Sequence, residues 1–186
     1  MNTTAVVDQG YATPEQALEV FDALGPVNPD FMLGAWQGSG LHTDHPMDGL
    51  LEAFHWHGKR FDSSESVHPL VFRSLSGGTR CLNPRFMGAS LGLVGKVPTP
   101  KSAIVGKIFQ LLMPLLSTRK PRARLRMTEY RGKSSATMVY DQLPINDVFR
   151  KVDDQTVMGA MDLRGLERPF FFVLRRETTS AGDHGL

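Results

Sequence analysis

A group of polar side chains closes one of the apolar stretches in the C-terminal half of the chain. Tyr140 and Asp141 end that stretch, and Asp147 and Arg150 follow it three positions apart. Arg150 can hold a carboxylate or carbonyl through charge-assisted hydrogen bonds. Asp141 or Asp147, beside an apolar cavity, can act as a general base with a raised pKa. We take both aspartates as candidate catalytic residues, with Arg150 or Tyr140 as the electrophile. The alternative is a structural corner in which Asp147 and Arg150 satisfy backbone groups.

Large side chains with a polar or polarisable atom form a second set of candidates. Trp36 stands between glycines, where an indole either plugs the core of a barrel or stacks on a ligand. The methionines either fill the core or form an adaptable wall, because thioethers repack around varied apolar ligands. The candidate ligand-binding residues are Trp36, Trp56, Met138, Tyr140, Arg150, Met158 and Phe172.

Histidine and cysteine do not form a metal-binding pattern. Five of the six histidines lie between His42 and His68 without an H-x-x-x-H spacing, and Cys81 is the one cysteine. A zinc site needs three or four ligands of compatible geometry, so no metal site is predicted. A single cysteine excludes an intramolecular disulfide, and residues 1–10 lack the pattern of a secretory signal. The cytoplasm is the expected location.

Composition favours one β-rich domain. The chain has 186 residues, 18 glycines and 12 prolines, which suits many turns rather than a helical bundle. The formal net charge of +2 gives no case for a nucleic-acid partner. No P-loop or dinucleotide-binding glycine motif occurs in the sequence.

The N-terminal half is expected to begin with a helix. Thr13 and Gln16 form a capping box around Pro14, and Gly25-Pro26 ends the apolar face. Residues 1–12 before this helix are expected to be disordered. The other elements expected here are a strand over 32–43, a short helix over 46–56, a strand over 68–75, an extended piece over 80–87 and a loop over 88–101.

The C-terminal half changes from helical to strand periodicity. A helical insertion is predicted over 101–121, with its helix at 102–116, and an antiparallel meander over 122–177. The meander strands are expected at 122–128, 136–141, 149–152, 155–162 and 169–176. Together these elements predict a mainly β, antiparallel, barrel-like single domain over 13–177. Residues 178–186 are expected to be a disordered tail.

Several blocks of sequence resemble a known family when read in order. They are GAWQG at 34–38, HPMDGLL at 45–51, WHGKRF at 56–61, HPL at 68–70, YDQLPINDVFR at 140–150 and MGAMD at 158–162. The first four resemble the GXWXG motif family over 13–100, and the last two resemble the domain of unknown function that usually follows it. The resemblance implies a lipocalin- or nitrobindin-like barrel, that is, a calycin-like fold. A nitrobindin-like barrel would imply haem on a histidine in its C-terminal part, but no histidine lies between His68 and His184. Haem is therefore disfavoured, and no cofactor is predicted.

The sequence as a whole favours binding of a small apolar or amphipathic ligand in the barrel interior. An acid/base enzyme of the isomerase, cyclase or hydratase type is the alternative, and a haem-binding barrel is the second alternative. The apolar stripe of helix 102–116 is too wide for a helix exposed to water, so we expect another surface to cover it. It either caps the barrel, moves as a lid, packs on a second copy in a homodimer or, with the basic residues at 119–126, makes weak contact with an anionic membrane.

Overall fold

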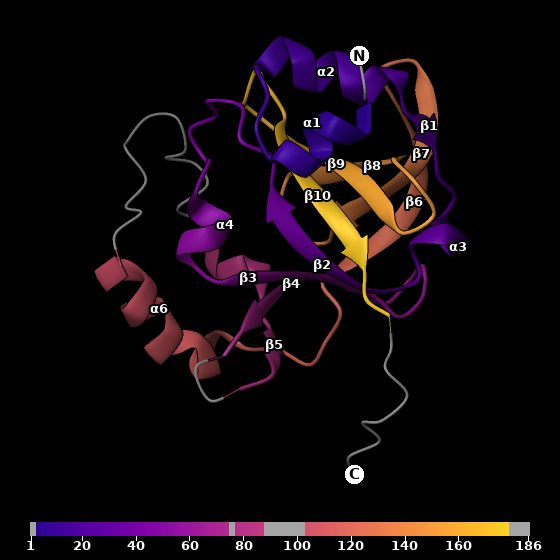
Figure 1. Ribbon diagram of the computed structural model, residues 1–186. Coiled ribbons are helices and arrows are strands. Elements are labelled where there is room, and N and C mark those ends of the chain that lie inside the picture. The colour runs from indigo at the N-terminus through magenta and orange to yellow at the C-terminus, as the bar shows by residue number, and fades with distance from the viewer. Residues whose placement is uncertain (1–2, 75–76, 88–102, 179–186) are drawn as a thin grey trace.

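The strands of the chain form one antiparallel sheet that closes on itself as a barrel (Figure 1). The computed structural model describes residues 3–74, 77–87 and 103–178. Strands β8, β7, β6, β4, β3, β2, β10 and β9 are hydrogen-bonded in that order, and β9 pairs again with β8. Their bounds are β2 Gly34–Gly40, β3 Trp56–Phe61, β4 Val67–Arg73, β6 Ala123–Tyr130, β7 Lys133–Tyr140, β8 Ile145–Lys151, β9 Thr156–Leu163 and β10 Phe170–Arg176. The predicted mainly β, antiparallel, barrel-like fold is confirmed.

Two short strands extend the barrel without entering the ring. Strand β1 (Gly25–Pro26) pairs with β8, and β5 (Thr79–Cys81) pairs with β4. Within the ring, pairing is least extensive between β4 and β6, where the described residues pair at Val67 and Ala123 alone. Farther along β4, backbone groups on this side can therefore bind partners other than β6.

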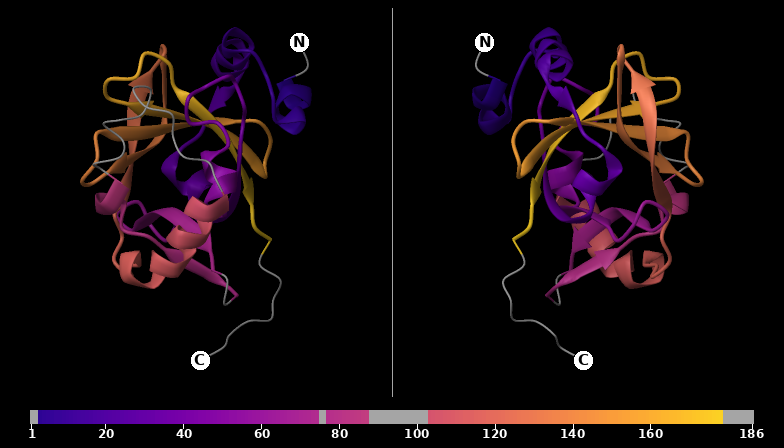
Figure 2. Two further views of the ribbon diagram at one scale, coloured as in Figure 1. Left: turned by 90° about the vertical axis from the view of Figure 1, so that its left-hand side faces the viewer. Right: turned by 90° about the vertical axis from the view of Figure 1, so that its right-hand side faces the viewer.

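Helices pack on the outside of the barrel in two separate places. The helices α1 (Thr3–Gln9) and α2 (Pro14–Ala23) lie on the outer face of β8, β9 and β10, and α6 (Ala103–Leu116) lies apart from them, beside β4 (Figure 2). The remaining helical elements are α3 Pro29–Met32, α4 Leu50–Ala53 and a 3₁₀ turn at Pro84–Met87. Among the described residues, every helix falls short of the length and apolarity that a membrane crossing requires.

Helix α2 begins as its sequence predicts. The Thr13 hydroxyl accepts a hydrogen bond from the Gln16 amide, and the Gln16 side chain accepts one from the Thr13 amide. The buried face of the helix packs on the outer side of the sheet, with Phe21 5.8 Å from Phe171 between ring centroids. The chain therefore has two apolar clusters, one inside the barrel and one between the barrel wall and α1 and α2.

Three predictions about the elements need correction. Residues 3–9, expected to be disordered, form α1, because Val6 and Val7 bury themselves in the cluster beneath α2. The helix expected at 46–56 is only the short α4, and the chain then enters β3. Strand β8 starts at Ile145 instead of residue 149. The loop expected over 88–101 and the tail at 179–186 lie outside the described residues.

Candidate functional site

The barrel interior contains a small cavity with mostly apolar walls. Its volume is about 70 Å³. Trp56, Tyr140 and Phe172 supply its aromatic walls, and two charged residues, Lys59 and Asp147, also line it. The other lining residues are Met47, Leu51, Leu70, Leu143, Ile145, Met161 and Phe170.

Lys59 and Asp147 form a buried ion pair across the barrel. Lys59 lies on β3 and Asp147 on β8, and their side chains are 4% and 1% exposed. The Lys59 ammonium donates a hydrogen bond of 2.8 Å to Asp147 Oδ2 and another of 3.2 Å to the Pro69 carbonyl. That carbonyl is on β4, beyond the point where β4 pairs with β6. Because β4 and β6 are not paired at this point, the Pro69 carbonyl accepts the hydrogen bond from the ammonium.

Three aromatic rings complete the surroundings of the ammonium. Lys59 Nζ lies 5.0 Å from the centre of the Phe172 ring, 5.5 Å from Trp56 and 5.9 Å from Tyr140. A cation over aromatic faces is attracted by the ring quadrupole, and the attraction grows when water is excluded. The same rings are therefore cavity walls and partners of the charge.

Burial controls the protonation of the acidic groups in this site. It raises the pKa of Asp147 above its ordinary value, while the positive charge of Lys59 and the hydrogen bond from it act in the opposite direction. Burial also raises the pKa of Tyr140 well above its ordinary value, and the negative charge of Asp147 adds to the effect. Tyr140 therefore remains a neutral phenol, and Asp147 takes up a proton more readily than an exposed aspartate does.

Two polar atoms of the site lack hydrogen-bond partners. Within the described residues, Asp147 Oδ1 and Trp56 Nε1 are buried and make no hydrogen bond. One is an acceptor and the other a donor. An unpaired buried polar group costs about 1–3 kcal/mol, so each of these atoms is a place where a partner would stabilise the protein.

Two glycines provide the space for the aromatic walls. A Cβ atom at Gly38 would lie 2.1 Å from the Trp56 ring, and one at Gly159 would lie 2.3 Å from the Phe172 ring. The two rings meet edge to face with centroids 5.9 Å apart. Gly38 is the second glycine of the GAWQG block, so that block shapes the cavity through Trp56.

The structure gathers four of the predicted site residues around the ion pair. Trp56, Tyr140 and Phe172 line the cavity with Asp147. Met138 pairs with Asp147 across β7 and β8 and belongs to the same interior cluster, although it does not line the cavity.

Trp36 is buried in the interior cluster but does not line the cavity. Its indole donates a hydrogen bond of 2.7 Å to the Met32 carbonyl, and the Arg176 guanidinium lies 4.2 Å from its ring centre. Its surroundings match the core-plugging alternative.

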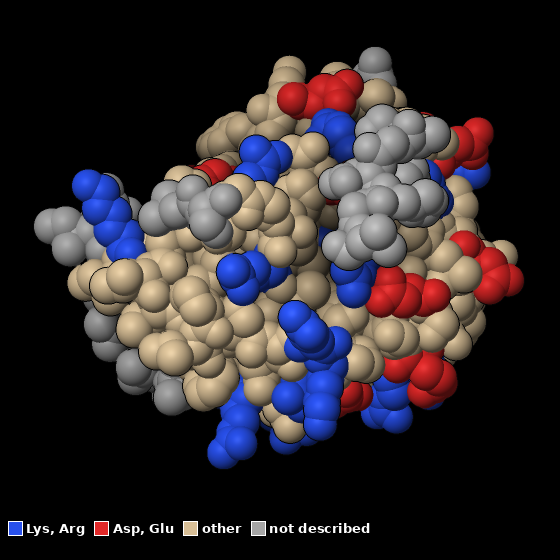
Figure 3. Space-filling model, turned by 90° about the horizontal axis from the view of Figure 1, so that it is seen from below, with Lys and Arg blue, Asp and Glu red and all other residues tan. Residues whose placement is uncertain are grey.

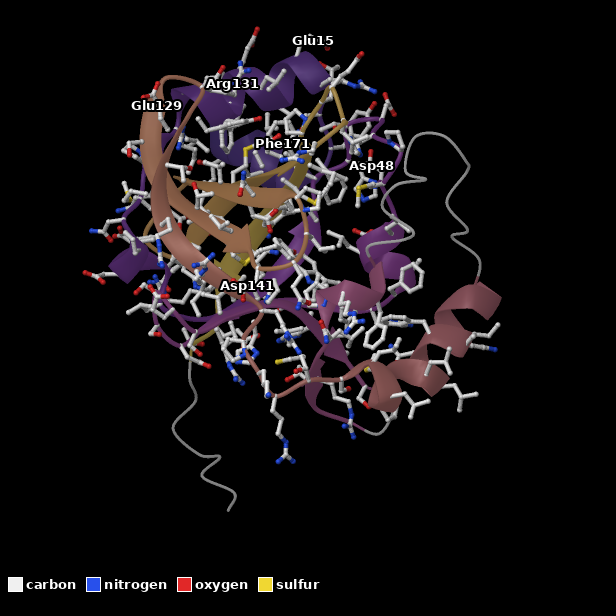
Figure 4. The ribbon with its side chains drawn as sticks, turned by 180° about the vertical axis from the view of Figure 1, so that it is seen from behind. Glu15, Asp48, Glu129, Arg131, Asp141 and Phe171 are labelled. Atoms are coloured by element: carbon white, nitrogen blue, oxygen red, sulfur yellow. The ribbon has the colours of Figure 1, made fainter. Side chains whose placement is uncertain are left out.

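Arg150, Met158 and Asp141 lie outside the barrel interior. Arg150 and Met158 pair with each other on β8 and β9, and Met158 packs in the cluster beneath α1 and α2. Arg150 donates to the Tyr130 and Lys133 carbonyls and lies 5.0 Å from the Phe21 ring. Asp141, which Figure 4 shows well away from Phe171, pairs at the surface with Arg124 at 3.1 Å. The predicted grouping of Arg150 and Asp141 with Asp147 does not form.

The separation follows from strand geometry. In a regular strand successive side chains point to opposite faces, so positions three apart on β8, such as Asp147 and Arg150, lie on opposite faces. Asp147 points inward and Arg150 outward.

Lys59 is the residue that the sequence analysis missed. Register shifts between Trp56, Gly58 and Arg60 mark a bulge in β3, which brings Trp56 and Lys59 to the same cavity although they are three apart. The glycine between two long side chains is the sequence signal of this bulge.

Neither a metal nor haem finds a site in the described part of the barrel. No group of three metal-ligating side chains occurs among the described residues. The lining of the cavity contains no histidine, and its volume is far below the roughly 300–1,000 Å³ of ordinary ligand and cofactor pockets. Haem does not fit this cavity.

Comparisons with known proteins agree with the order of the sequence blocks. The model of the family described as "GXWXG protein" matches residues 19–77, and the model described as "Domain of unknown function (DUF4334)" matches residues 121–176. No curated protein matches the chain. A crystal structure of a protein from Thermomonospora curvata matches with a TM-score of 0.68 and 31% sequence identity, over 94% of this chain and 95% of that one. The chain belongs to the family of GXWXG proteins that continue into the DUF4334 domain.

Proposed function

We propose that the barrel binds a small, largely apolar molecule that carries one polar group. The observation behind this proposal is the Lys59–Asp147 pair in the wall of an otherwise apolar cavity. A buried ion pair contributes little to stability compared with apolar residues of similar size. Selection for stability alone does not account for it, whereas recognition of a polar group does.

The unpaired atoms indicate which polar group suits the site. A hydroxyl supplies both a donor and an acceptor, the two functions that Asp147 Oδ1 and Trp56 Nε1 lack. An alcohol on a compact hydrocarbon is therefore the ligand class that matches the site best.

The ligand is expected to enlarge the cavity. A volume of about 70 Å³ holds only a few heavy atoms. Met47 and Leu51 belong to the connection between β2 and β3 and close the cavity from outside the strand ring. Thioether and short-helix segments repack more readily than hydrogen-bonded strands, so we place the opening there.

An acid/base enzyme is the second candidate, because Asp147 and Tyr140 line one cavity. Asp147 would take a proton from a carbon next to a carbonyl and return it to a neighbouring carbon, as in an isomerase. Tyr140 would donate a hydrogen bond to the carbonyl oxygen as negative charge develops there. Cyclase and hydratase chemistry would need the same two roles. Asp141 and Arg150 have no part in this version, because neither lines the cavity.

The single cysteine remains consistent with a reducing compartment, and we propose the cytoplasm as the location.

Mass spectrometry of the native protein tests the binding proposal. A small molecule should co-purify with the wild-type chain and be missing from the double variant Lys59→Met/Asp147→Leu. The control is Met158→Leu, a change beneath α1 and α2 that should leave the bound molecule in place. Equal occupancy in the wild type and the double variant would contradict the proposal. Conversion of the molecule by the wild type but not by Asp147→Asn would favour the enzyme.

A further inference from the structure

Helix α6 presents an apolar face to solvent. Phe109 anchors the helix, with ring centroids 4.9 Å from Phe54 and 5.1 Å from Phe72. On the other side Leu111 and Leu115 are 79% and 78% exposed, and Ile108 and Leu112 beside them are also exposed. Leucines one turn apart that are this exposed form a stripe that water solvates poorly.

The stretch of sequence that contains α6 carries charges of one sign. Residues 66–128 contain eleven lysines and arginines and no aspartate or glutamate. Since the whole chain has 21 basic and 19 acidic residues, the remainder carries 10 basic and 19 acidic residues. Positive and negative charges are therefore strongly separated along the sequence, although the net charge is only +2.

Some of these cations lack an acidic partner. Arg124 and Arg126 pair with Asp141 and Glu65. In contrast, no carboxylate of the described residues lies within ion-pair distance of Lys107 on α6 or of Arg80, Arg119 and Lys120.

A groove lined by arginines and hydroxyl residues lies where the chain leaves α6. It has a volume of about 550 Å³, and Arg60, Arg80 and Arg119 line it together with the hydroxyl residues Ser117 and Thr118. Arg60 is paired with Asp62 at 3.0 Å, whereas Arg80 and Arg119 remain available. Guanidinium groups bind phosphate with two parallel hydrogen bonds, and hydroxyls add further donors.

The face seen from below shows this arrangement. In Figure 3, lysines and arginines cross the middle of the face, beside a broad uncharged area on the side where α6 lies in Figure 1. The acidic residues gather on the opposite side.

We propose that α6 and the groove beside it form a docking surface for a membrane that contains anionic phospholipids. The leucines of α6 would enter the boundary between headgroups and acyl chains, and Arg80 and Arg119 would bind lipid phosphate. An apolar helical face next to basic residues is the combination that favours anionic bilayers.

A second copy of the chain fits this surface less well. Two copies that met symmetrically through α6 would bring the same basic residues together, since a two-fold interface is formed from one patch on both sides. The like charges would oppose that dimer, whereas an anionic surface compensates them. The proposal does not depend on a ligand in the barrel.

Vesicle sedimentation with the full chain tests the proposal. Binding is expected to phosphatidylcholine vesicles that contain phosphatidylglycerol and not to phosphatidylcholine alone, and high salt should release the protein because it screens exposed charges. Arg119→Gln/Lys120→Gln should weaken binding roughly 30-fold, given the usual contribution of each basic residue near an anionic surface. Leu111→Gln/Leu115→Gln should weaken it at least as much, with an unchanged circular dichroism spectrum.

The matched control removes the same two charges elsewhere. Arg164→Gln/Arg168→Gln in the β9–β10 turn should leave vesicle binding unchanged. The proposal is overturned if the wild type does not sediment with anionic vesicles, or if the control weakens binding as much as Arg119→Gln/Lys120→Gln. A dimer that Leu111→Gln/Leu115→Gln abolishes, without any vesicle binding, would assign the face to a second copy instead.

Discussion

Asp147 and Arg150 are both buried to about 1% exposure on β8, but they lie on opposite sides of the barrel wall. Arg150 is held by backbone carbonyls and the Phe21 ring, in packed surroundings between the wall and α2. Asp147 has one cationic partner, one oxygen without a hydrogen bond and a cavity beside it. Burial, charge and one buried polar atom without a hydrogen bond among the described residues (Asp147 Oδ1 and Arg150 Nε) are common to both, so none of these features marks a binding site. The adjoining cavity distinguishes the inner residue from the outer one.

The largest expected effect comes from removing one member of the inner pair. Lys59→Met leaves Asp147 buried without its cation, and we expect the free energy of unfolding to fall by about 3–5 kcal/mol. The double variant Lys59→Met/Asp147→Leu should recover most of this loss, because no unpaired charge remains. Urea unfolding of the two variants measures both values. A single variant within about 1 kcal/mol of the wild type would show that Asp147 does not depend on Lys59.

On the outer face, Arg150→Met should cost less. It removes hydrogen bonds from a charged donor to carbonyls but keeps much of the apolar stem, so we expect a loss of roughly 1.5–3 kcal/mol. Ligand affinity should stay within the error of the wild-type value. If the folded variant lost ligand, Arg150 would belong to the site after all, and the distinction between the two faces would fail.

The pH dependence of stability sharpens the contrast. Because burial raises the pKa of Asp147, the folded protein binds this proton more tightly than the unfolded chain does. The resulting stability is present below the unfolded pKa and is lost as pH rises through the folded pKa. Lys59 opposes the rise, so the loss in Lys59→Met should be smaller near pH 4 than near pH 7. A loss independent of pH in urea titrations would mean that Asp147 is not the group left unpaired.

The smallest effect is expected at Asp141. Its ion pair with Arg124 is partly exposed, and such pairs contribute less than about 1 kcal/mol. Asp141→Asn should therefore leave stability and ligand binding close to wild type in thermal unfolding and titration. A large loss of binding would place Asp141 in the site.

The regular part of the fold is predictable from the sequence. Period-two alternation marks β6 and β7, short apolar runs between turns mark β9 and β10, and the capping box marks the start of α2. The bulge in β3 hides its alternation, so the sequence predicts a helix that runs to residue 56 and no strand over 56–61. Polar residues at Asn146 and Asp147 similarly masked the start of β8.

The site is only partly predictable, for the same reason. Trp56, Tyr140, Asp147 and Phe172 are predictable because aromatic and acidic residues are distinctive in apolar strands. Lys59 is not predictable, because the face of a residue beyond a bulge cannot be counted from spacing alone. The grouping of Asp147 with Arg150 relied on closeness in sequence and neglected the alternation of the strand.

Methionine-methyl NMR tests the central claim most directly, because methionines lie on both sides of the wall. Met47 and Met161 line the cavity, and Met158 lies beneath α1 and α2. Titration with cyclohexanol should shift the Met47 and Met161 methyl signals and leave Met158 unchanged. Methylcyclohexane, which lacks the hydroxyl, should bind more weakly to the wild type, and this difference should disappear in Lys59→Met/Asp147→Leu. Shifts confined to Met158, or equal affinity of the wild type for both probes, would contradict a binding site built around the Lys59–Asp147 pair.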